Sequence, residues 1–160
     1  MKMFGALHLM TACLLTLASP LLAQAIATCT SPSGYSYNHH QGFIDEENSG
    51  WIEDAISGGV VTLQKLADGT YDILFLDATK QIFSSRQDGG HILLMRNGIN
   101  DATFLHFNPG MVIELYTFWK SSDGDFFYDL IQSKGGDGML FHKSALMIGT
   151  CGAIDFSLIE

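Results

Sequence analysis

The sequence predicts an all-β domain, an antiparallel meander of seven or eight strands that forms a small up-and-down barrel or, as the alternative, a two-sheet β-sandwich. Three observations predict it. β-Prone runs of roughly six to ten residues recur from residue 60 onward. Short turns rich in Gly, Asp and Asn separate these runs, and no long helical pattern lies between them. Because parallel strands need crossovers of about a dozen residues or more, such short connections require antiparallel neighbours.

The turns define the strands in chain order. Asp68-Gly69 and Asn97-Gly98 are dipeptides typical of tight β-hairpins. Further glycine-containing turns at 88–90, 108–110 and 121–124 separate later runs. The barrel is favoured because consecutive short turns carry the chain around a closed sheet and remove its edges. The predicted strands are 60–66, 70–77, 80–85, 91–96, 102–107, 111–120, 125–133 and 139–148.

The first 25 residues predict a cleaved secretory signal peptide. Lys2 gives a weakly positive start, residues 4–22 carry no charge, and Ala-Gln-Ala at 23–25 places small residues where a signal peptidase reads them. Pro20 and other breaks argue against a retained span, which needs about 20 apolar residues. We therefore expect cleavage after Ala25, no membrane span afterwards, and an exported protein in the periplasm or outside the cell.

Residues 26–160 are then one structural domain, long enough for a single core. The segment 26–58 is rich in turn-forming residues, and we expect it to be an irregular lead-in. Within it, residues 50–56 fit a short helix or an irregular strand. The antiparallel β domain proper is expected over 59–160.

The cysteines predict one disulfide. Cys13 leaves with the signal peptide, so Cys29 and Cys151 remain, and an even count in an exported protein is typical of a disulfide. The bridge is expected to tether the lead-in to the end of the last strand. Without C-x-x-C spacing, the two thiols make a poor zinc site and a poor redox pair.

The charge balance is acidic. The chain carries 17 Asp and Glu against 8 Lys and Arg, a formal net charge of −9. Such a surface repels nucleic acids and anionic lipid headgroups, so we expect neither as a partner. It favours a cationic partner, or it serves solubility alone.

Motifs of catalysis and metal binding do not stand out. The histidines lack H-x-x-x-H and H-E-x-x-H spacing, and no G-x-S-x-G motif occurs, so we expect no metal and no cofactor. A small hydrolase using Glu114, Asp129 or a histidine is the alternative function, because both carboxylates interrupt apolar strands that are expected to be neighbours. Strand alternation predicts instead that both carboxylates point to solvent.

Aromatic side chains are the one enriched feature that is typical of binding. They lead us to expect a non-catalytic binding or interaction module, whose partner is a small apolar ligand or a cationic protein such as a lysozyme. Core packing is the competing explanation of the aromatics, and a structural component of the cell envelope is a further alternative. The candidate binding residues are Tyr35, Tyr37, Trp51, Tyr116 and Trp119.

The pentapeptide Ser-Gly-Tyr-Ser-Tyr at 33–37 fits a loose S-G-x-x-Y pattern. It resembles the loop motif of periplasmic lysozyme inhibitors, small exported β proteins that insert such a loop into a lysozyme cleft. The resemblance covers these five residues, does not assign the chain to that family, and implies a contact role for Tyr35 and Tyr37. Gly50-Trp51 is similar to the G-x-W signature of lipocalins, with different spacing.

Several predicted strands are apolar on both faces. In 71–76 and 111–119, large apolar residues occupy both the odd and the even positions, whereas a half-exposed antiparallel strand should alternate. We therefore expect the outer face to be covered, either by the N-terminal segment around Phe43 and Trp51 or by another subunit. A homo-oligomer is accordingly one expected state.

Overall fold

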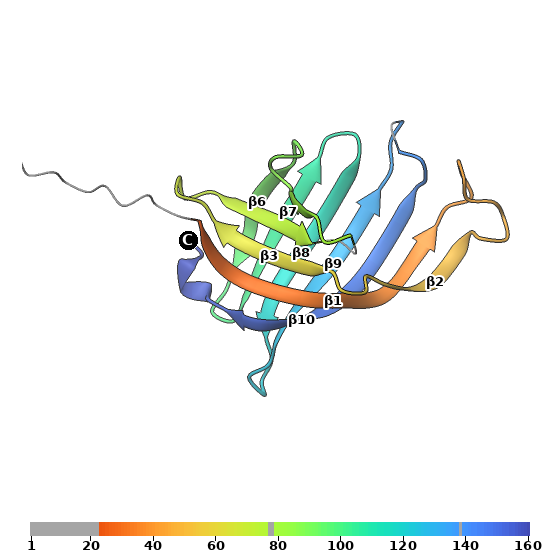
Figure 1. Ribbon diagram of the computed structural model, residues 1–160. Helices are drawn as coiled ribbons and strands as arrows, with labels where there is room; N and C mark the ends of the chain where they lie inside the picture. The colour runs from red at the N-terminus through yellow and green to blue at the C-terminus, as the bar shows by residue number, and fades with distance from the viewer. Residues whose placement is uncertain (1–22, 77–78, 138) are drawn as a thin grey trace, which may run out of the picture.

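The computed structural model describes residues 23–76, 79–137 and 139–160, and they form an almost purely antiparallel β structure (Figure 1). The all-β prediction is confirmed. Within the described residues, no helix is long and apolar enough to cross a membrane. The expected signal-peptide core lies outside this part of the chain. The elements are β1 (Gln24–Asn38), β2 (Gly50–Ala55), β3 (Val60–Lys65), β4 (Tyr71–Leu76), β5 (Ile82–Ser84), β6 (His91–Asn97), β7 (Asp101–Asn108), β8 (Val112–Lys120), β9 (Phe126–Lys134), β10 (Lys143–Ile154) and the 3-10 turn η1 (Phe156–Leu158).

All ten strands belong to one curled sheet. Its order is β5-β4-β3-β1-β10-β9-β8-β7-β6, and β2 pairs with β1 beside this path. The sheet curls so that β4 lies across the core from β7 and β8, where the rings of Tyr71 and Phe104 meet at 5.0 Å and those of Phe75 and Tyr116 at 6.0 Å (Figure 1). The barrel-like prediction therefore takes the form of a half-barrel, whose edges are β5 and β6.

The eight strands predicted from residue 60 onward are all present, with boundaries shifted by a few residues. The largest shift is in β10, which runs from Lys143 to Ile154 and not over 139–148. Two of the predicted turns have the backbone conformation that glycine favours: Gly69 and Gly124 adopt φ angles of 82° and 95°, a left-handed region that residues with a Cβ rarely adopt. The turn at Asn97-Gly98 differs, because Gly98 does not have a positive φ.

The N-terminal segment differs from its prediction. Gln24–Asn38 is not an irregular lead-in but a strand of 15 residues that lies inside the sheet, between β3 and β10. Its Ser, Thr, Pro and Gly residues resemble a loop when read locally. Partners on both sides satisfy its backbone and override this local preference, as tertiary context commonly does in strands.

Strand β1 changes partner along one of its edges. Residues 24–30 pair with β3 and residues 33–38 pair with β2, while β10 pairs along the other edge. Pro32, which has no N–H to donate, lies at the changeover, where the register with β10 shifts between Thr30 and Ser33. The open alternative for residues 50–56 is thereby decided in favour of a strand.

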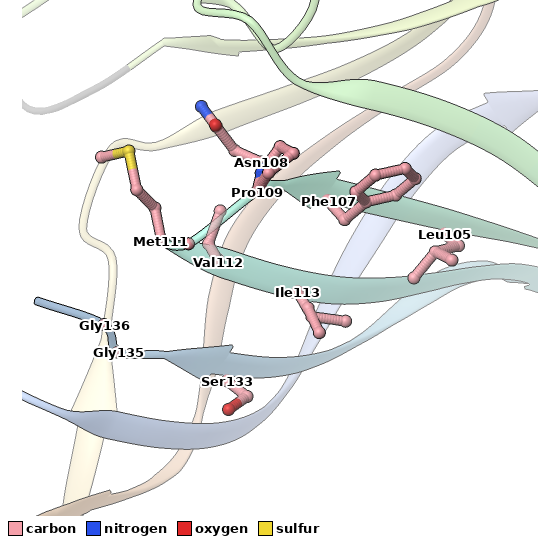
Figure 2. A pocket seen from close by; sticks show the side chains of 11 residues that line it. Leu105, Phe107, Asn108, Pro109, Met111, Val112, Ile113, Ser133, Gly135 and Gly136 are labelled. Carbon is pink, nitrogen blue, oxygen red and sulfur yellow. The ribbon is translucent and has the colours of Figure 1, made fainter.

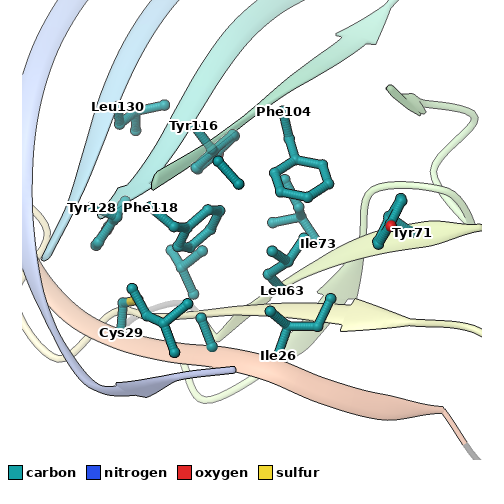
Figure 3. Packing of buried hydrophobic residues seen from close by; sticks show 14 of the residues in the cluster. Ile26, Cys29, Leu63, Tyr71, Ile73, Phe104, Tyr116, Phe118, Tyr128 and Leu130 are labelled. Carbon is teal, nitrogen blue, oxygen red and sulfur yellow. The ribbon is translucent and has the colours of Figure 1, made fainter. Parts of the chain in front are cut away.

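The inner face of the sheet carries the core (Figure 3). Phe104, Tyr116, Phe118 and Tyr128 are fully buried, and the rings of Phe118 and Tyr128 stack 6.0 Å apart. These side chains fill most of the half-barrel. The interior is therefore a packed core and not an empty cup, apart from the pocket described below.

The predicted disulfide is present, but it joins different elements from those expected. Cys29 and Cys151 are directly opposed in β1 and β10, with an S–S distance of 2.03 Å. Because β1 is a central strand, the bridge links two neighbours in the middle of the sheet and does not tether a loose segment.

The outer face of the sheet is not covered by the N-terminal segment. Phe43 and Trp51, the two residues expected to cover it, are themselves 80% and 70% exposed. The hypothesis that the N-terminal segment covers the outer face is wrong, because this segment itself forms two strands of the sheet.

Candidate functional site

A pocket of about 260 Å³ opens between the two walls of the half-barrel. One wall comes from β1, β3 and β4, and the other from β7, β8 and β9. The walls are largely apolar, and a few polar side chains converge between them. The lining residues are Pro32, Ile56, Val61, Phe75, His106, Val112, Glu114, Tyr116, Tyr128, Leu130, Gln132 and Lys134.

The polar centre of this pocket is a row of three residues on three adjacent strands. His106 of β7 is paired in register with Glu114 of β8, and Glu114 with Gln132 of β9. The Nδ1 atom of His106 lies 2.7 Å from Oε2 of Glu114, and Gln132 donates its amide hydrogen to Oε1. Tyr116, two residues further along β8, donates its hydroxyl hydrogen to Oε2 at 2.9 Å. The buried carboxylate therefore has partners on both oxygens.

These contacts determine the ionisation of Glu114. Burial alone would raise its pKa, but the hydrogen bond and charge of His106 and the donors Tyr116 and Gln132 outweigh it. The pKa consequently lies below the ordinary value, and Glu114 is a carboxylate at neutral pH. Burial and this carboxylate raise the pKa of Tyr116 well above its usual range, so Tyr116 stays a neutral donor.

One buried polar atom of a residue that lines the pocket has no partner. The hydroxyl of Tyr128 is buried and makes no hydrogen bond within the described chain. Burial and the charge of Glu114 raise the pKa of Tyr128, so this hydroxyl is neutral and can donate or accept. Ser85 Oγ is likewise buried and unpartnered, but Ser85 does not line the pocket.

The two carboxylates considered for hydrolysis do not form a pair. Glu114 points inward and is buried, so the expectation that it faces solvent is wrong. Asp129 lies opposite Thr117, an odd number of residues from Gln132, and therefore on the other face of the sheet. There its carboxylate accepts a hydrogen bond from the indole of Trp119 at 3.0 Å.

The five predicted binding residues fall into separate places. Tyr116 is in the core and lines the pocket, whereas Trp119 lies on the outer face, stacked on Phe127 at 4.8 Å. The other three, Tyr35, Tyr37 and Trp51, are also on the outer face, on β1 and β2. The rings of Tyr37 and Trp51 meet edge to face at 5.4 Å.

The segment 33–37 is not a loop. It lies within β1 and is paired with β10 on one side and β2 on the other. Close packing against β10 requires a glycine in this segment, because a Cβ at Gly34 would lie 2.1 Å from the carbonyl oxygen of Leu146. The geometry therefore does not match the protruding loop of lysozyme inhibitors.

His106, Gln132 and Tyr128 were missed as site residues by sequence reasoning. Each is an even number of residues away from the core residues of its own strand and therefore faces inward with them. This alternation is the sequence signal that could have identified them. That alternation alone does not show which positions of different strands are opposed. The row appears only once the register of β7, β8 and β9 is known.

Other features of the described residues are less suited to a ligand. No group of three or more His, Cys, Asp or Glu could hold a metal ion there, although the rings of His39 and His142 come within 6.5 Å. A second hollow of about 350 Å³ lies beside the turn between β7 and β8 (Figure 2). Turn residues and outward-facing Leu105, Phe107 and Ile113 line it, and neither of the buried unpartnered atoms belongs to it.

Comparison of the chain with protein-family models, with curated proteins and with solved structures finds no match in any of the three.

Proposed function

We propose that this protein is a non-catalytic binding module that holds a small, largely apolar molecule in the pocket between the two walls of the half-barrel. The observation that carries the proposal is the Tyr128 hydroxyl, a buried polar group without a protein partner among the described residues, on a side chain that lines the largely apolar pocket. Leaving such a group unsatisfied costs about 1–3 kcal/mol, which a ligand atom bonded to it would recover.

The pocket restricts the chemistry of the ligand. Its volume of about 260 Å³ is near the lower end of the range for small-molecule sites, roughly 300–1,000 Å³. Val61, Phe75 and Leu130 offer apolar contacts. Glu114 already has three donors, and the Tyr128 hydroxyl is the buried side-chain polar atom of the described lining residues that has no partner. The best fit is a compact apolar molecule with one neutral oxygen.

The hydrolase alternative finds less support. Its carboxylate pair is separated by the sheet, and Nδ1 of His106 is engaged by Glu114. Ser85, the buried serine with a free hydroxyl, makes no hydrogen bond to His106. A nucleophile bonded to a base is the usual mark of such sites.

Cyclohexanone tests the proposal, with methylenecyclohexane as the ligand of matched shape that lacks the oxygen. We expect cyclohexanone to shift the methyl NMR signals of Val61 and Leu130. Tyr128→Phe should weaken its binding about fivefold, the loss of one hydrogen bond of about 1 kcal/mol, and leave the hydrocarbon unaffected.

Two controls accompany this titration. Tyr35→Phe makes the same change at an exposed tyrosine on the outer face and should have no effect. Tyr128→Phe should not destabilise the unliganded protein, since it removes an unpaired hydroxyl. If neither compound shifts these methyl signals at millimolar concentration, the pocket does not take apolar molecules and the proposal fails.

A cationic protein such as a lysozyme is a second candidate partner. One observation favours it: Tyr35 and Trp51 are exposed on the outer face, and Glu53 is paired with Tyr35. Such binding should weaken steeply as ionic strength rises, whereas an apolar ligand should hardly respond. Unchanged lysozyme activity in the presence of excess protein would remove this candidate.

Export of the protein is also a proposal. The disulfide between Cys29 and Cys151 is consistent with an oxidising compartment. A mature N-terminus at Ile26, read by mass spectrometry on the native protein, would support cleavage of the signal peptide after Ala25.

A further inference from the structure

A continuous row of apolar side chains crosses the outer face of six adjacent strands. The cross-strand partners run in one line from β6 through β7, β8, β9 and β10 to β1. We call this line the outer row, and its members are Leu93, Leu105, Leu115, Ile131, Leu146 and Tyr35.

Much of the outer row is accessible to solvent. Ile131 is 54% exposed and Leu146 52% exposed, although both sit in the middle of long, well-paired strands. Ile113 and Ile148, which lie on neighbouring rows, are exposed to the same degree. The outer row is therefore continuous across the strands, whereas along the strands apolar residues alternate with polar ones such as Asp129, Ser133 and Ser144. Monomeric proteins rarely expose contiguous apolar patches larger than a few hundred Å².

The charge pattern identifies what can cover this patch. No charged residue belongs to the outer row. Asp129, on the next row, is engaged by Trp119, and Glu53 lies beyond the end of the row at Tyr35. A cationic protein would find no anion at the centre. Anionic lipid headgroups would be repelled by a chain with a net charge of −9.

The outer face of a second copy of this chain has the apolar chemistry needed to cover the outer row. Aliphatic side chains of two sheets interdigitate when the sheets pack face to face about 10 Å apart. A twofold axis through the middle of the row would place the same residues on both sides of the interface, as in most homodimers. The outer row itself brings no charged group to the interface, and Asp129 on the next row already has the indole of Trp119 as a partner.

The size of the patch is of the order that a dimer needs. Six strands about 4.8 Å apart span about 29 Å, and three outward residues per strand span about 20 Å, which gives roughly 600 Å² in projection. The two flanking rows mix apolar with polar side chains, among them Asp129 and Ser133, as protein interfaces commonly do. Side-chain relief raises this toward the ~800 Å² per partner of a standard interface. Because the sheet curls, closest contact falls on the middle strands, and we expect a dissociation constant of roughly micromolar size.

We propose that two copies of this chain form a twofold dimer through the outer row, with Leu115 and Ile131 nearest the axis. The dimer leaves the pocket between the walls untouched, because the pocket opens on the opposite face of the sheet. Dimerisation through the outer row therefore does not depend on ligand binding in the pocket.

Sedimentation of the purified protein over a range of concentrations tests this. We expect the wild type to be a dimer at roughly 100 µM, well above the expected dissociation constant. Ile131→Lys should convert it to a monomer at that concentration, since the two lysines would meet near the axis. The matched control is Ile99→Lys, at an apolar residue that is 91% exposed in the turn between β6 and β7, away from the outer row. It should stay a dimer.

Two results would overturn the proposal: a wild type that is monomeric at this concentration, or an Ile131→Lys variant that remains dimeric. Circular dichroism and urea unfolding show whether the variant is folded. If Ile131→Lys does not fold, Leu146→Lys replaces it, because Leu146 is its partner in the row and is equally exposed.

Discussion

The surroundings of Glu114 differ from those that its sequence pattern predicts. A glutamate inside an apolar strand would ordinarily face water, yet this one faces the core beside His106, Tyr116 and Gln132. A buried carboxylate is tolerated only when its oxygens are hydrogen-bonded, and all three partners are supplied by neighbouring positions of one sheet. The cluster is therefore stable as a unit and sensitive to the loss of any member.

Replacing Glu114 with Gln should lower the free energy of unfolding by about 2–3 kcal/mol at pH 7, the scale of lost hydrogen bonds to a buried charged group. The pKa of Glu114 is lowered from 4.5 in the folded protein. Its contribution is therefore present above about pH 4.5 and is lost as the pH falls through the folded-state pKa. Urea unfolding at pH 7 and pH 3 measures this. The difference in unfolding free energy between the wild type and the variant should be smaller at pH 3 than at pH 7.

The control for Glu114→Gln is Glu53→Gln, which makes the same change at an exposed glutamate of β2. It should leave the unfolding free energy within about 0.5 kcal/mol of the wild type, as is usual for surface changes. A wild-type advantage over Glu114→Gln that stays constant from pH 7 to pH 3 would contradict the proposed ionisation.

Among the elements, β1 depends on close approach to β10. A Cβ at Gly34 would lie 2.1 Å from the carbonyl oxygen of Leu146 and 2.9 Å from Cα of Met147, both backbone atoms that cannot rotate away. We therefore expect Gly34→Ala to cost about 1–3 kcal/mol, the usual price of overpacking, in a urea unfolding measurement.

Gly152→Ala is the matched control, because nothing lies within 4 Å of a Cβ at that position of β10. It should be neutral or slightly stabilising, since alanine restricts the unfolded chain. Equal losses for the two variants would show that the effect is one of strand propensity and not of the β1–β10 contact.

Strand β2 lies beside the main strand order and is attached to the sheet along one edge. It pairs with β1 alone, and its side chains are mostly exposed. Its inward anchor is Asp54, whose carboxylate accepts hydrogen bonds from Ser36 of β1 and Lys143 of β10. We expect the amides of β2 to exchange hydrogen faster than those of β9, because local opening costs least where few apolar contacts are made.

Asp54→Ala should speed this exchange further in β2 and leave β9 unchanged. Slower exchange in β2 than in β9 would mean that contacts other than Asp54 hold the strand.

For the whole molecule, the disulfide closes a loop across almost the entire described chain. Cys29 and Cys151 are 122 residues apart, and the loop-entropy relation assigns such a bridge about 4–5 kcal/mol. If Cys29 only tethered a loose lead-in, reduction of the disulfide would loosen that lead-in first. Because β1 is instead a central strand, it cannot detach without opening the sheet on both of its sides. Replacing both cysteines with Ala should therefore lower protection in β1, β9 and β10 together in hydrogen exchange. Loss of protection in β1 alone would contradict this.

Much of the architecture was predictable because turn chemistry is local. Turn-forming dipeptides such as Asp68-Gly69 mark hairpins through local backbone conformation, and turns of this kind delimit the eight strands from β3 to β10. Asn97-Gly98 also lies at a hairpin, although Gly98 does not adopt a positive φ. Tyr116, a binding candidate from the sequence, lines the pocket, and its role in binding stays a prediction. The two strands before Val60 were not predicted as such, because their partners are far away in the chain.

The sequence by itself determined the β class, the antiparallel connections and the pairing of the two cysteines, since each depends on neighbouring residues or on a simple count. Only the tertiary structure decided that Gln24–Asn38 is a central strand, that Glu114 faces His106, and that the apolar residues of six strands form one outer row. These three features depend on register between strands. A shift of one residue would turn every side chain of a strand to the opposite face, and the turn geometry and the burial of one face set that register together in the folded sheet.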